Sequence, residues 1–199
     1  MLLAVSKTRP PGDIQAAFEA GLRDFGESYL REAVAKIDYL SDLPLTWHFI
    51  GPIQSNKTRP IAEHFQWVHS VDREKIARRL NDQRPAELPP LQVCLQVNIS
   101  GEKSKSGCSP AQLPELARIV DALPMLSLRG LMAIPAATKD EARQREAFAR
   151  LRMIFEELQA DFPEMDTLSM GMSADLEAAI AEGSTLVRVG TAIFGPRGG

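Results

Sequence analysis

The sequence has few cysteines, few histidines and no marked excess of charge of either sign. It contains two cysteines, Cys94 and Cys108, with no C-x-x-C pair, and three histidines, so neither a disulfide framework nor a zinc site is predicted. The net charge of −3 gives no electrostatic reason to expect nucleic acid or an anionic membrane as a partner. It also has no apolar run of membrane-spanning length and no signal-peptide pattern. These absences favour a cytoplasmic protein.

What the sequence does contain is a regular alternation of apolar, strand-like runs with amphipathic helical patterns. Its 199 residues, 44% of them hydrophobic, suffice for one domain with a substantial core. The expected strands lie within 1–8, 22–27, 45–51, 67–71, 91–99, 126–134, 167–171 and 185–189. Eight strands separated by helices predict a single-domain (β/α)8 barrel, the TIM-barrel fold, over residues 1–199. An open doubly wound sheet is the alternative, because periodicity does not show closure, the chain is short for a barrel and no full helix follows the last strand.

Several polar residues mark the expected starts of helices. Ser28, Asp72 and Ser173 each stand before an amphipathic pattern, and we expect each to cap the helix that follows. Residues 109–112 form a capping box with proline at its favoured first position. A long helix is expected over about 140–161. In the helix after Ser28, the expected buried face carries Leu30, Val34, Ile37 and Leu40.

Lys7 ends the first apolar run, where a turn residue would be more usual. In parallel α/β folds, catalytic residues gather at the carboxyl ends of the strands. Burial at such a place would lower the pKa of the lysine and free its amine to attack a carbonyl carbon. An exposed lysine at the start of a loop is the alternative, and this stretch alone does not decide between them.

The ends of the last two strands have the residues of an anion-binding site. Ser173 precedes a helical pattern whose first-turn amides would point toward a bound anion. Gly190 and Thr191 open a helical turn, and the glycine leaves its backbone accessible. In barrels, the loops after strands seven and eight are the usual phosphate site. The alternative is structural: Ser173 only caps its helix, and Gly190 only turns the chain.

Arg188 lies within an otherwise apolar strand, between Val187 and Val189. A buried arginine stays charged and needs a partner. That partner is either a carboxylate elsewhere in the barrel or an acceptor atom of a ligand. His48 and His69 also fall within expected strands, and we interpret them as polar core residues rather than as part of a pocket wall.

Six segments of the sequence, taken in order, resemble motifs of the pyridoxal phosphate homeostasis protein family and together span nearly the whole chain. They are Val5-Ser6-Lys7-Thr8, Phe25-Gly26-Glu27-Ser28-Tyr29, Trp47-His48-Phe49-Ile50-Gly51, Gln54-Ser55-Asn56-Lys57, Ser169-Met170-Gly171-Met172-Ser173 and Val187-Arg188-Val189-Gly190-Thr191-Ala192-Ile193-Phe194-Gly195. The resemblance implies the barrel of the alanine racemase N-terminal domain and pyridoxal 5′-phosphate (PLP) as cofactor. By the same resemblance, Lys7 would be the Schiff-base lysine that attaches PLP covalently, and Arg188 would face the pyridine nitrogen. Ser173, Gly190 and Thr191 would bind the phosphate, the glycine and threonine mainly through backbone N–H groups.

Three features qualify the resemblance. Lys105, in the loop Ser104-Lys105-Ser106-Gly107, matches a family position near the barrel mouth. It is either a second amine that accepts PLP during transfer or a solvated loop lysine. The family usually has asparagine in place of Ser28, so a polar contact from Ser28 to the cofactor would be shorter and weaker. The family also has a leading helical segment before the first strand; here it is absent or lies outside the numbering, and if it is absent we expect an exposed apolar patch on the barrel wall.

The resemblance implies PLP binding with little or no turnover. Arg188 stays protonated near neutral pH, so the ring nitrogen should be neutral and the stabilisation of a carbanion weak. Racemases that share this barrel take a second base from a further β domain, and we expect no such domain here, because few residues follow the last strand. We therefore expect a monomeric PLP homeostasis protein that buffers PLP or hands it to apo-enzymes. A PLP-dependent amino-acid racemase and a cofactor-free Schiff-base aldolase remain the alternatives.

Overall fold

The structure is a computed structural model, and it describes residues 1–102 and 106–196. In chain order the elements are β1 (Leu2–Val5), α1 (Pro11–Glu19), β2 (Asp24–Glu27), α2 (Leu30–Tyr39), β3 (Thr46–Phe49), η1 (Ser55–Lys57), α3 (Thr58–His64), β4 (Trp67–Val71), α4 (Glu74–Gln83), β5 (Leu91–Gln96), η2 (Pro110–Gln112), α5 (Leu113–Asp121), β6 (Leu126–Met132), α6 (Glu141–Gln159), β7 (Thr167–Ser169), α7 (Leu176–Ala181), β8 (Val187–Val189) and α8 (Thr191–Phe194), where η denotes a 3-10 helix. Each expected strand is present, and none is longer than its sequence pattern.

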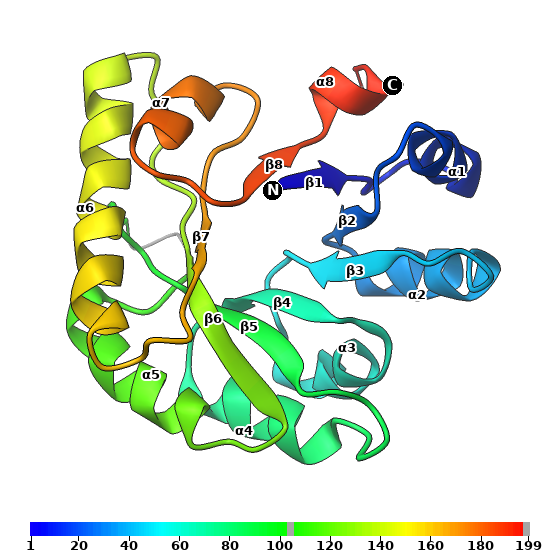
Figure 1. Ribbon diagram of the computed structural model, residues 1–199, viewed down its shortest axis with the longest axis horizontal. Helices are drawn as coiled ribbons and strands as arrows, with labels where there is room; N and C mark the ends of the chain where they lie inside the picture. The colour runs from blue at the N-terminus through cyan, green and yellow to red at the C-terminus, as the bar shows by residue number, and fades with distance from the viewer. Residues whose placement is uncertain (103–105, 197–199) are drawn as a thin grey trace.

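The strands form one parallel sheet that closes on itself. Neighbours follow the order β7-β6-β5-β4-β3-β2-β1-β8, so the last strand pairs with the first. The seam between β7 and β8 is joined by a parallel bridge between Ser169 and Leu186 and by a hydrogen bond from Met170 N to Leu186 O at 3.1 Å. Figure 1 shows β8 lying beside β1. The fold is therefore the predicted (β/α)8 barrel, and the alternative of an open doubly wound sheet is wrong.

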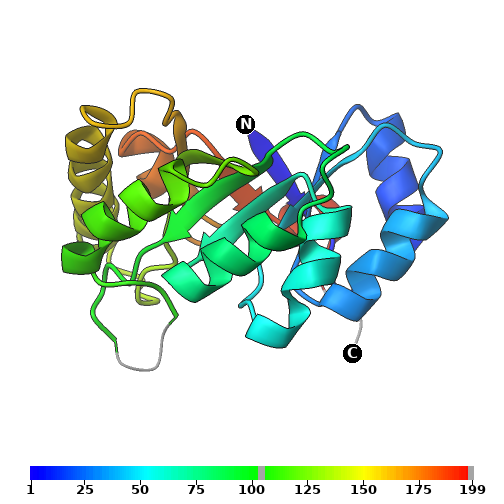
Figure 2. The same cartoon turned by 90° about the horizontal axis from the view of Figure 1, so that it is seen from below.

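The apolar core lies mainly between the strands and the helices around them. Buried helix residues such as Ile14, Leu80 and Phe148 belong to the same cluster as the strand residues Phe25 and Val68. Helices α3, α4 and α5 lie side by side outside the strands (Figure 2). Burying one face of each helix against the sheet is the usual source of stability for this architecture.

The inside of the barrel contains polar side chains. The Nδ1 atom of His69 on β4 lies 2.8 Å from the Oγ atom of Ser169 on β7, although β4 and β7 are not neighbours in the sheet. Their contact therefore crosses the barrel interior. His48 and His69 are both fully buried, which confirms their interpretation as polar core residues.

Three predicted helix caps are wrong. Ser28 and Asp72 each lie one residue before the N-cap position, and neither α2 nor α4 has a side-chain cap. Ser173 lies two residues before Asp175, the N-cap of α7. The Asp175 carboxylate accepts a hydrogen bond from Met172 N at 2.6 Å, which keeps this segment in a turn before the helix begins. A side chain caps a helix from the position directly before its first turn, so none of the three can do so.

Two other predicted helix starts are confirmed. The capping box of residues 109–112 is present, where it opens η2, directly before α5. The carboxylate of Asp140 caps the long helix α6 and accepts a hydrogen bond from Ala142 N at 3.0 Å. Within the part of the chain that the structure describes, no helix is both long and apolar enough to cross a membrane.

Candidate functional site

Lys7 lies directly beyond the carboxyl end of β1, at the mouth of the barrel. Its side chain is half-buried and lines a cavity of about 950 Å³. The wall of this cavity includes residues from the ends of β2 and β3 and from α2 and α3, among them Ser28, Val34, Phe49, Ile50, Gly51 and Ile61. Lys7 therefore lies in a turn and lines a partly apolar cavity that is large enough for a small organic ligand.

The residue before Lys7 is held by a buried ammonium group that the sequence analysis did not identify. Lys36 on α2 is 4% exposed, and its Nζ atom donates to Ser6 O and to Glu27 Oε1, each at 2.8 Å, and also to Glu32 Oε1. Glu27 is fully buried, and its Oε1 atom accepts a second hydrogen bond from Ser6 Oγ at 2.6 Å. Burial raises the pKa of the Glu27 carboxyl, an effect that the hydrogen bond from Lys36 opposes.

The residue after Lys7 is hydrogen-bonded to Glu32, the carboxylate that also accepts from Lys36. Thr8 N donates to Glu32 Oε1 at 2.6 Å. Thr8 also has a φ of +64°, a conformation that β-branched residues rarely adopt and that its surroundings must stabilise. The two residues that flank Lys7 are therefore both anchored to α2 or β2, which fixes the direction in which the chain leaves β1.

The buried face of α2 is rotated from the predicted one. Ala33, Lys36 and Leu40 are buried, whereas Val34 and Ile37 are only half-buried. The rotation brings Lys36 toward the buried carboxylate of Glu27. The sequence could have indicated this face, because Ala33, Lys36 and Leu40 are spaced so that they lie on one side of a helix. The lysine among them, however, made a buried face look unfavourable.

Arg188 on β8 carries a buried positive charge. It is 4% exposed, its Nη1 atom donates to Ser169 O at 2.6 Å and Ser169 Oγ at 2.9 Å, and its Nη2 atom donates to Ala133 O at 2.9 Å. No carboxylate among the described residues lies within ion-pair distance of it, so the predicted alternative of a structural ion pair finds no partner there. The N–H group of Nε and one of those on Nη2 donate to none of the described residues. Burial lowers the pKa of Arg188 to about 10, which leaves it charged at neutral pH.

The predicted phosphate-binding residues are only partly brought together. Gly190 follows β8, where a Cβ atom would lie 3.3 Å from Val5 O, so it packs closely against the strand that leads to Lys7. Thr191 is exposed and begins the short helix α8. Ser173 is exposed and lines a separate cavity of about 490 Å³, with residues at the starts of α6 and α7. Lys105 lies outside the described residues.

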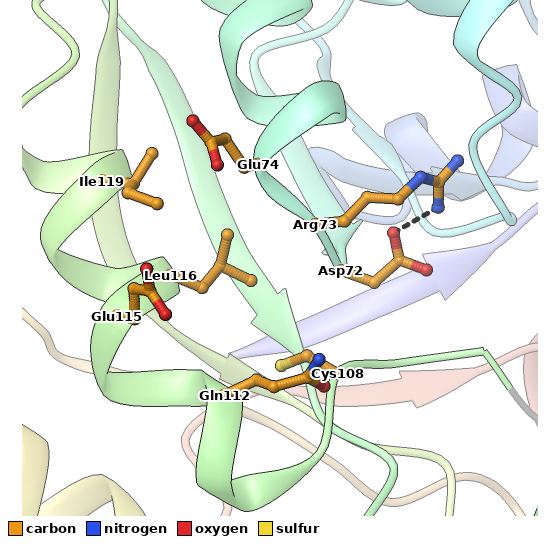
Figure 3. Close-up of a pocket in the computed structure, with 8 residues that line it drawn as sticks. All are labelled: Asp72, Arg73, Glu74, Cys108, Gln112, Glu115, Leu116 and Ile119. Atoms are coloured by element: carbon orange, nitrogen blue, oxygen red, sulfur yellow. Dashed lines mark hydrogen bonds and ion pairs between the residues drawn. The ribbon is translucent and has the colours of Figure 1, made fainter.

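A third hollow lies on the outer wall of the barrel, between α4 and α5, and is shown in Figure 3. It measures about 190 Å³, and Glu74 and Glu115 face it from the two helices, with Cys108 at one end. Burial raises the pKa of the Cys108 thiol to about 11. None of the predicted site residues lines this hollow, and an unreactive thiol beside carboxylates offers no second candidate for the chemistry of Lys7.

Comparison with known proteins identifies the family of this chain. The sequence matches the family described as alanine racemase, N-terminal domain, over residues 1–198. It is 68% identical over 196 residues to the pyridoxal phosphate homeostasis protein of Pseudomonas aeruginosa, a match that covers 98% of this chain and 84% of that protein. The structure resembles that of PipY from Synechococcus elongatus, at 42% identity and with coverage of 98% and 92% of the two chains. The TM-score is 0.92 for PipY without PLP and 0.89 for PipY with PLP bound. The chain therefore belongs to the pyridoxal phosphate homeostasis protein family.

Proposed function

We propose that this protein binds PLP and takes part in PLP homeostasis. The name of the Pseudomonas aeruginosa relative and the PLP bound to PipY support the proposal. The observation that carries it is the buried guanidinium of Arg188, which has unused N–H groups and lies on the strand paired with the one that ends at Lys7. A buried cation with spare donors, on a strand next to the one that leads to an amine, is suited to an acceptor-bearing, anionic aldehyde.

The proposal assigns residues of this chain to each part of PLP. Lys7 would attach the cofactor covalently and reversibly through its amine. Arg188 would donate a hydrogen bond to the pyridine nitrogen from the N–H groups that its protein partners leave unused. Gly190 and Thr191 would bind the phosphate through backbone N–H groups, and Ser173 through its hydroxyl. The close packing of Gly190 against Val5 supports this assignment, because a side chain there would crowd the strand that leads to Lys7.

The charge on Arg188 supports binding with little turnover. When bound, PLP supplies an aldehyde that reacts with amines and a ring that withdraws electrons most strongly when its nitrogen is protonated. Arg188 keeps its own proton, because its pKa, although lowered by burial, is still about 10. It can therefore donate a hydrogen bond at the ring nitrogen but not accept one.

We further propose a cytoplasmic monomer that hands PLP to apo-enzymes. Cys94 and Cys108 are free thiols, as is usual in a reducing compartment. Large exposed apolar side chains are distributed over separate elements, such as Tyr39 on α2, Met153 on α6 and Ile180 on α7, which favours a chain without an extensive apolar interface. Sedimentation velocity checks the monomer, and recovery of activity by an apo-enzyme mixed with the loaded protein checks the transfer.

The test of PLP binding compares the wild type with Lys7→Ala and Lys75→Ala after incubation with PLP and removal of free cofactor. Lys75 is exposed on α4 and controls for the loss of a lysine. We expect visible-range absorbance and a borohydride-trapped adduct in the wild type and Lys75→Ala only. An adduct that persists in Lys7→Ala would overturn the assignment of the amine. A wild type without visible absorbance would overturn PLP binding and favour the aldolase, and rapid, Lys7-dependent racemisation of L-alanine would identify a racemase.

A further inference from the structure

A continuous series of hydrogen bonds crosses the barrel interior from Arg188 to Asp24. Arg188 Nη1 lies 2.9 Å from Ser169 Oγ, which lies 2.8 Å from His69 Nδ1. His69 Nε2 lies 2.9 Å from His48 Nδ1, and His48 Nε2 lies 3.1 Å from Asp24 Oδ1. We call these five residues the interior chain. They come from β8, β7, β4, β3 and β2.

One end of the interior chain, Asp24, lies toward the amino-terminal face of the barrel. Asp24 begins β2, and its side chain is 25% exposed. Lys7 and the cavity it lines lie at the other ends of the strands. The interior chain therefore connects a solvent-accessible carboxylate on the amino-terminal face to the guanidinium that serves the proposed PLP site.

The chemistry of the two ends fixes the direction of every hydrogen bond between them. A guanidinium has only donors, so Ser169 Oγ must accept from Arg188, and an ionised carboxylate has only acceptors, so His48 Nε2 must carry a proton toward Asp24. If His48 is neutral, its Nδ1 atom then accepts from His69 Nε2–H. The Nδ1 atom of His69 is left as an acceptor, and the Ser169 hydroxyl supplies its proton.

The opposite order would require a charged histidine inside the barrel. If His69 donated to Ser169 from Nδ1, its Nε2 atom would have to accept from His48 Nδ1, and His48 would carry protons on both nitrogens. Burial opposes that state, since it lowers the pKa of both imidazoles, that of His69 well below its usual value. The contact with Asp24 acts the other way on His48 but is the smaller effect.

We propose that Ser169, His69, His48 and Asp24 are positioning residues for Arg188, joined in a one-way hydrogen-bond chain that makes Asp24 the distant counter-charge of the guanidinium. Both histidines are then neutral and protonated at Nε2. Each link polarises the next, so the negative charge at Asp24 strengthens the acceptor that Ser169 offers to Arg188. The proposed consequence for PLP rests on the proposed function, whereas the order of the hydrogen bonds does not.

The first experiment determines the histidine tautomers of the apo protein by 15N NMR of the full chain labelled at histidine. We expect His48 and His69 to be protonated at Nε2 only. The third histidine, His64, is an internal reference, because its Nδ1 atom lies 2.9 Å from Pro60 O and must donate to that carbonyl. An Nδ1-protonated or doubly protonated His48 or His69 at neutral pH would overturn the proposal, whether or not the protein binds PLP.

The second experiment removes the distant charge while keeping its shape. Asp24→Asn is compared with Asp38→Asn, which changes an exposed carboxylate on α2 outside the interior chain. We expect Asp24→Asn to shift the absorbance maximum of bound PLP and to raise its dissociation constant about three- to tenfold, with no change for Asp38→Asn. An Asp24→Asn protein with the wild-type spectrum and affinity would overturn the counter-charge. If Asp24→Asn does not fold, the tautomers of the wild type still decide the proposal.

Discussion

The Nζ atom of Lys36 lies 2.8 Å from the carbonyl oxygen of Ser6, the residue directly before Lys7. A second hydrogen bond of the same length runs from Lys36 Nζ to the fully buried carboxylate of Glu27. One ammonium thus links α2, β2 and the end of β1. Since Lys7 follows without an intervening residue, the geometry of the proposed attachment point depends on a lysine that has no contact with the cofactor in our proposal.

Lys36→Met should destabilise the protein by about 3 kcal/mol, because removing one partner of a buried ion pair leaves the other without compensation. It should also slow the attachment of PLP to Lys7, since Ser6 O loses the hydrogen bond from Lys36 and retains the one from Arg9 N at 3.0 Å. Urea denaturation measures the first effect and the rise of visible absorbance the second. Lys75→Met, on the exposed face of α4, should change neither. Wild-type stability in Lys36→Met would contradict the role given to the buried ion pair.

Gly51→Ala should disturb the cavity that Lys7 lines. A Cβ atom at residue 51 would lie 2.3 Å from Ser28 O, and because that atom is main chain, it cannot move aside cheaply. We expect a loss of about 1–3 kcal/mol in unfolding free energy and weaker PLP binding. Gly12→Ala in α1 is the matched control, since its Cβ atom meets nothing within 4 Å and alanine favours a helix. Equal effects of the two substitutions would show that the close approach at Gly51 is unimportant.

Acid should destabilise the protein below about pH 6.5 through His48 and His69. Their pKa values are lowered by burial, so the unfolded chain takes up protons near the usual value of 6.5 that the folded chain does not. Their contribution to stability is present above pH 6.5 and falls as the pH drops below it, by about 1.4 kcal/mol per pH unit for each histidine. The charged groups at the ends of the pair are Asp24 and Arg188. Urea denaturation between pH 7 and pH 5 measures this slope.

Glu27 acts in the opposite direction over part of the same range. Burial raises the pKa of the Glu27 carboxyl. The stability that this group contributes to the folded protein is therefore present below pH 4.5 and is lost as the pH rises through its pKa in the folded state. The effect of the imidazoles is isolated by comparing the wild type with His69→Gln. The variant should be less stable at pH 7 but should lose stability about half as steeply on acidification. Parallel curves for the two proteins would mean that His69 takes up a proton in the folded state as readily as in the unfolded one.

Ser28→Asn should strengthen PLP binding. Ser28 lines the cavity with Lys7, and its side chain is shorter than the asparagine usual at this position in the family. One added hydrogen bond of about 1 kcal/mol corresponds to roughly a fivefold lower dissociation constant. Ser28→Ala controls for simple loss of the hydroxyl and should bind at most as tightly as the wild type. Equilibrium titration by absorbance separates the three proteins, and an unchanged constant in Ser28→Asn would exclude a polar contact at this position.

The order of the strands could be predicted because each strand is encoded locally. Runs such as 67–71 and 91–96 are mostly apolar, and this pattern can be recognised without knowledge of the rest of the chain. Periodicity alone could not show that the barrel closes, since the pairing of β1 with β8 joins residues at opposite ends of the sequence. The predicted helix starts at Ser28 and Ser173 were wrong by one and two residues. At both places the geometry of the turn, rather than the residue type, decides where the helix begins.

The sequence singled out Lys7 and Arg188 as candidate site residues but not the residues that hold them in place. Lys7 and Arg188 stand out in the sequence because each is a cation inside or beside an apolar strand. Lys36 does not stand out, because lysines are ordinary on amphipathic helices. The contact between His69 and Ser169 spans 100 sequence positions and exists only when the barrel has closed. Polar partners across a barrel interior follow from three-dimensional register, which composition and periodicity do not contain.

The pairing of Leu3 with Arg188 has a consequence for how the protein matures. During synthesis, β1, which leads to Lys7, leaves the ribosome long before β8, which carries Arg188. For most of translation, only one part of the proposed PLP site therefore exists. If Lys7 and Arg188 bind PLP as proposed, binding would wait until the polypeptide is almost complete, and a prematurely terminated product would lack the guanidinium. Loading with PLP would thereby report that biosynthesis has finished.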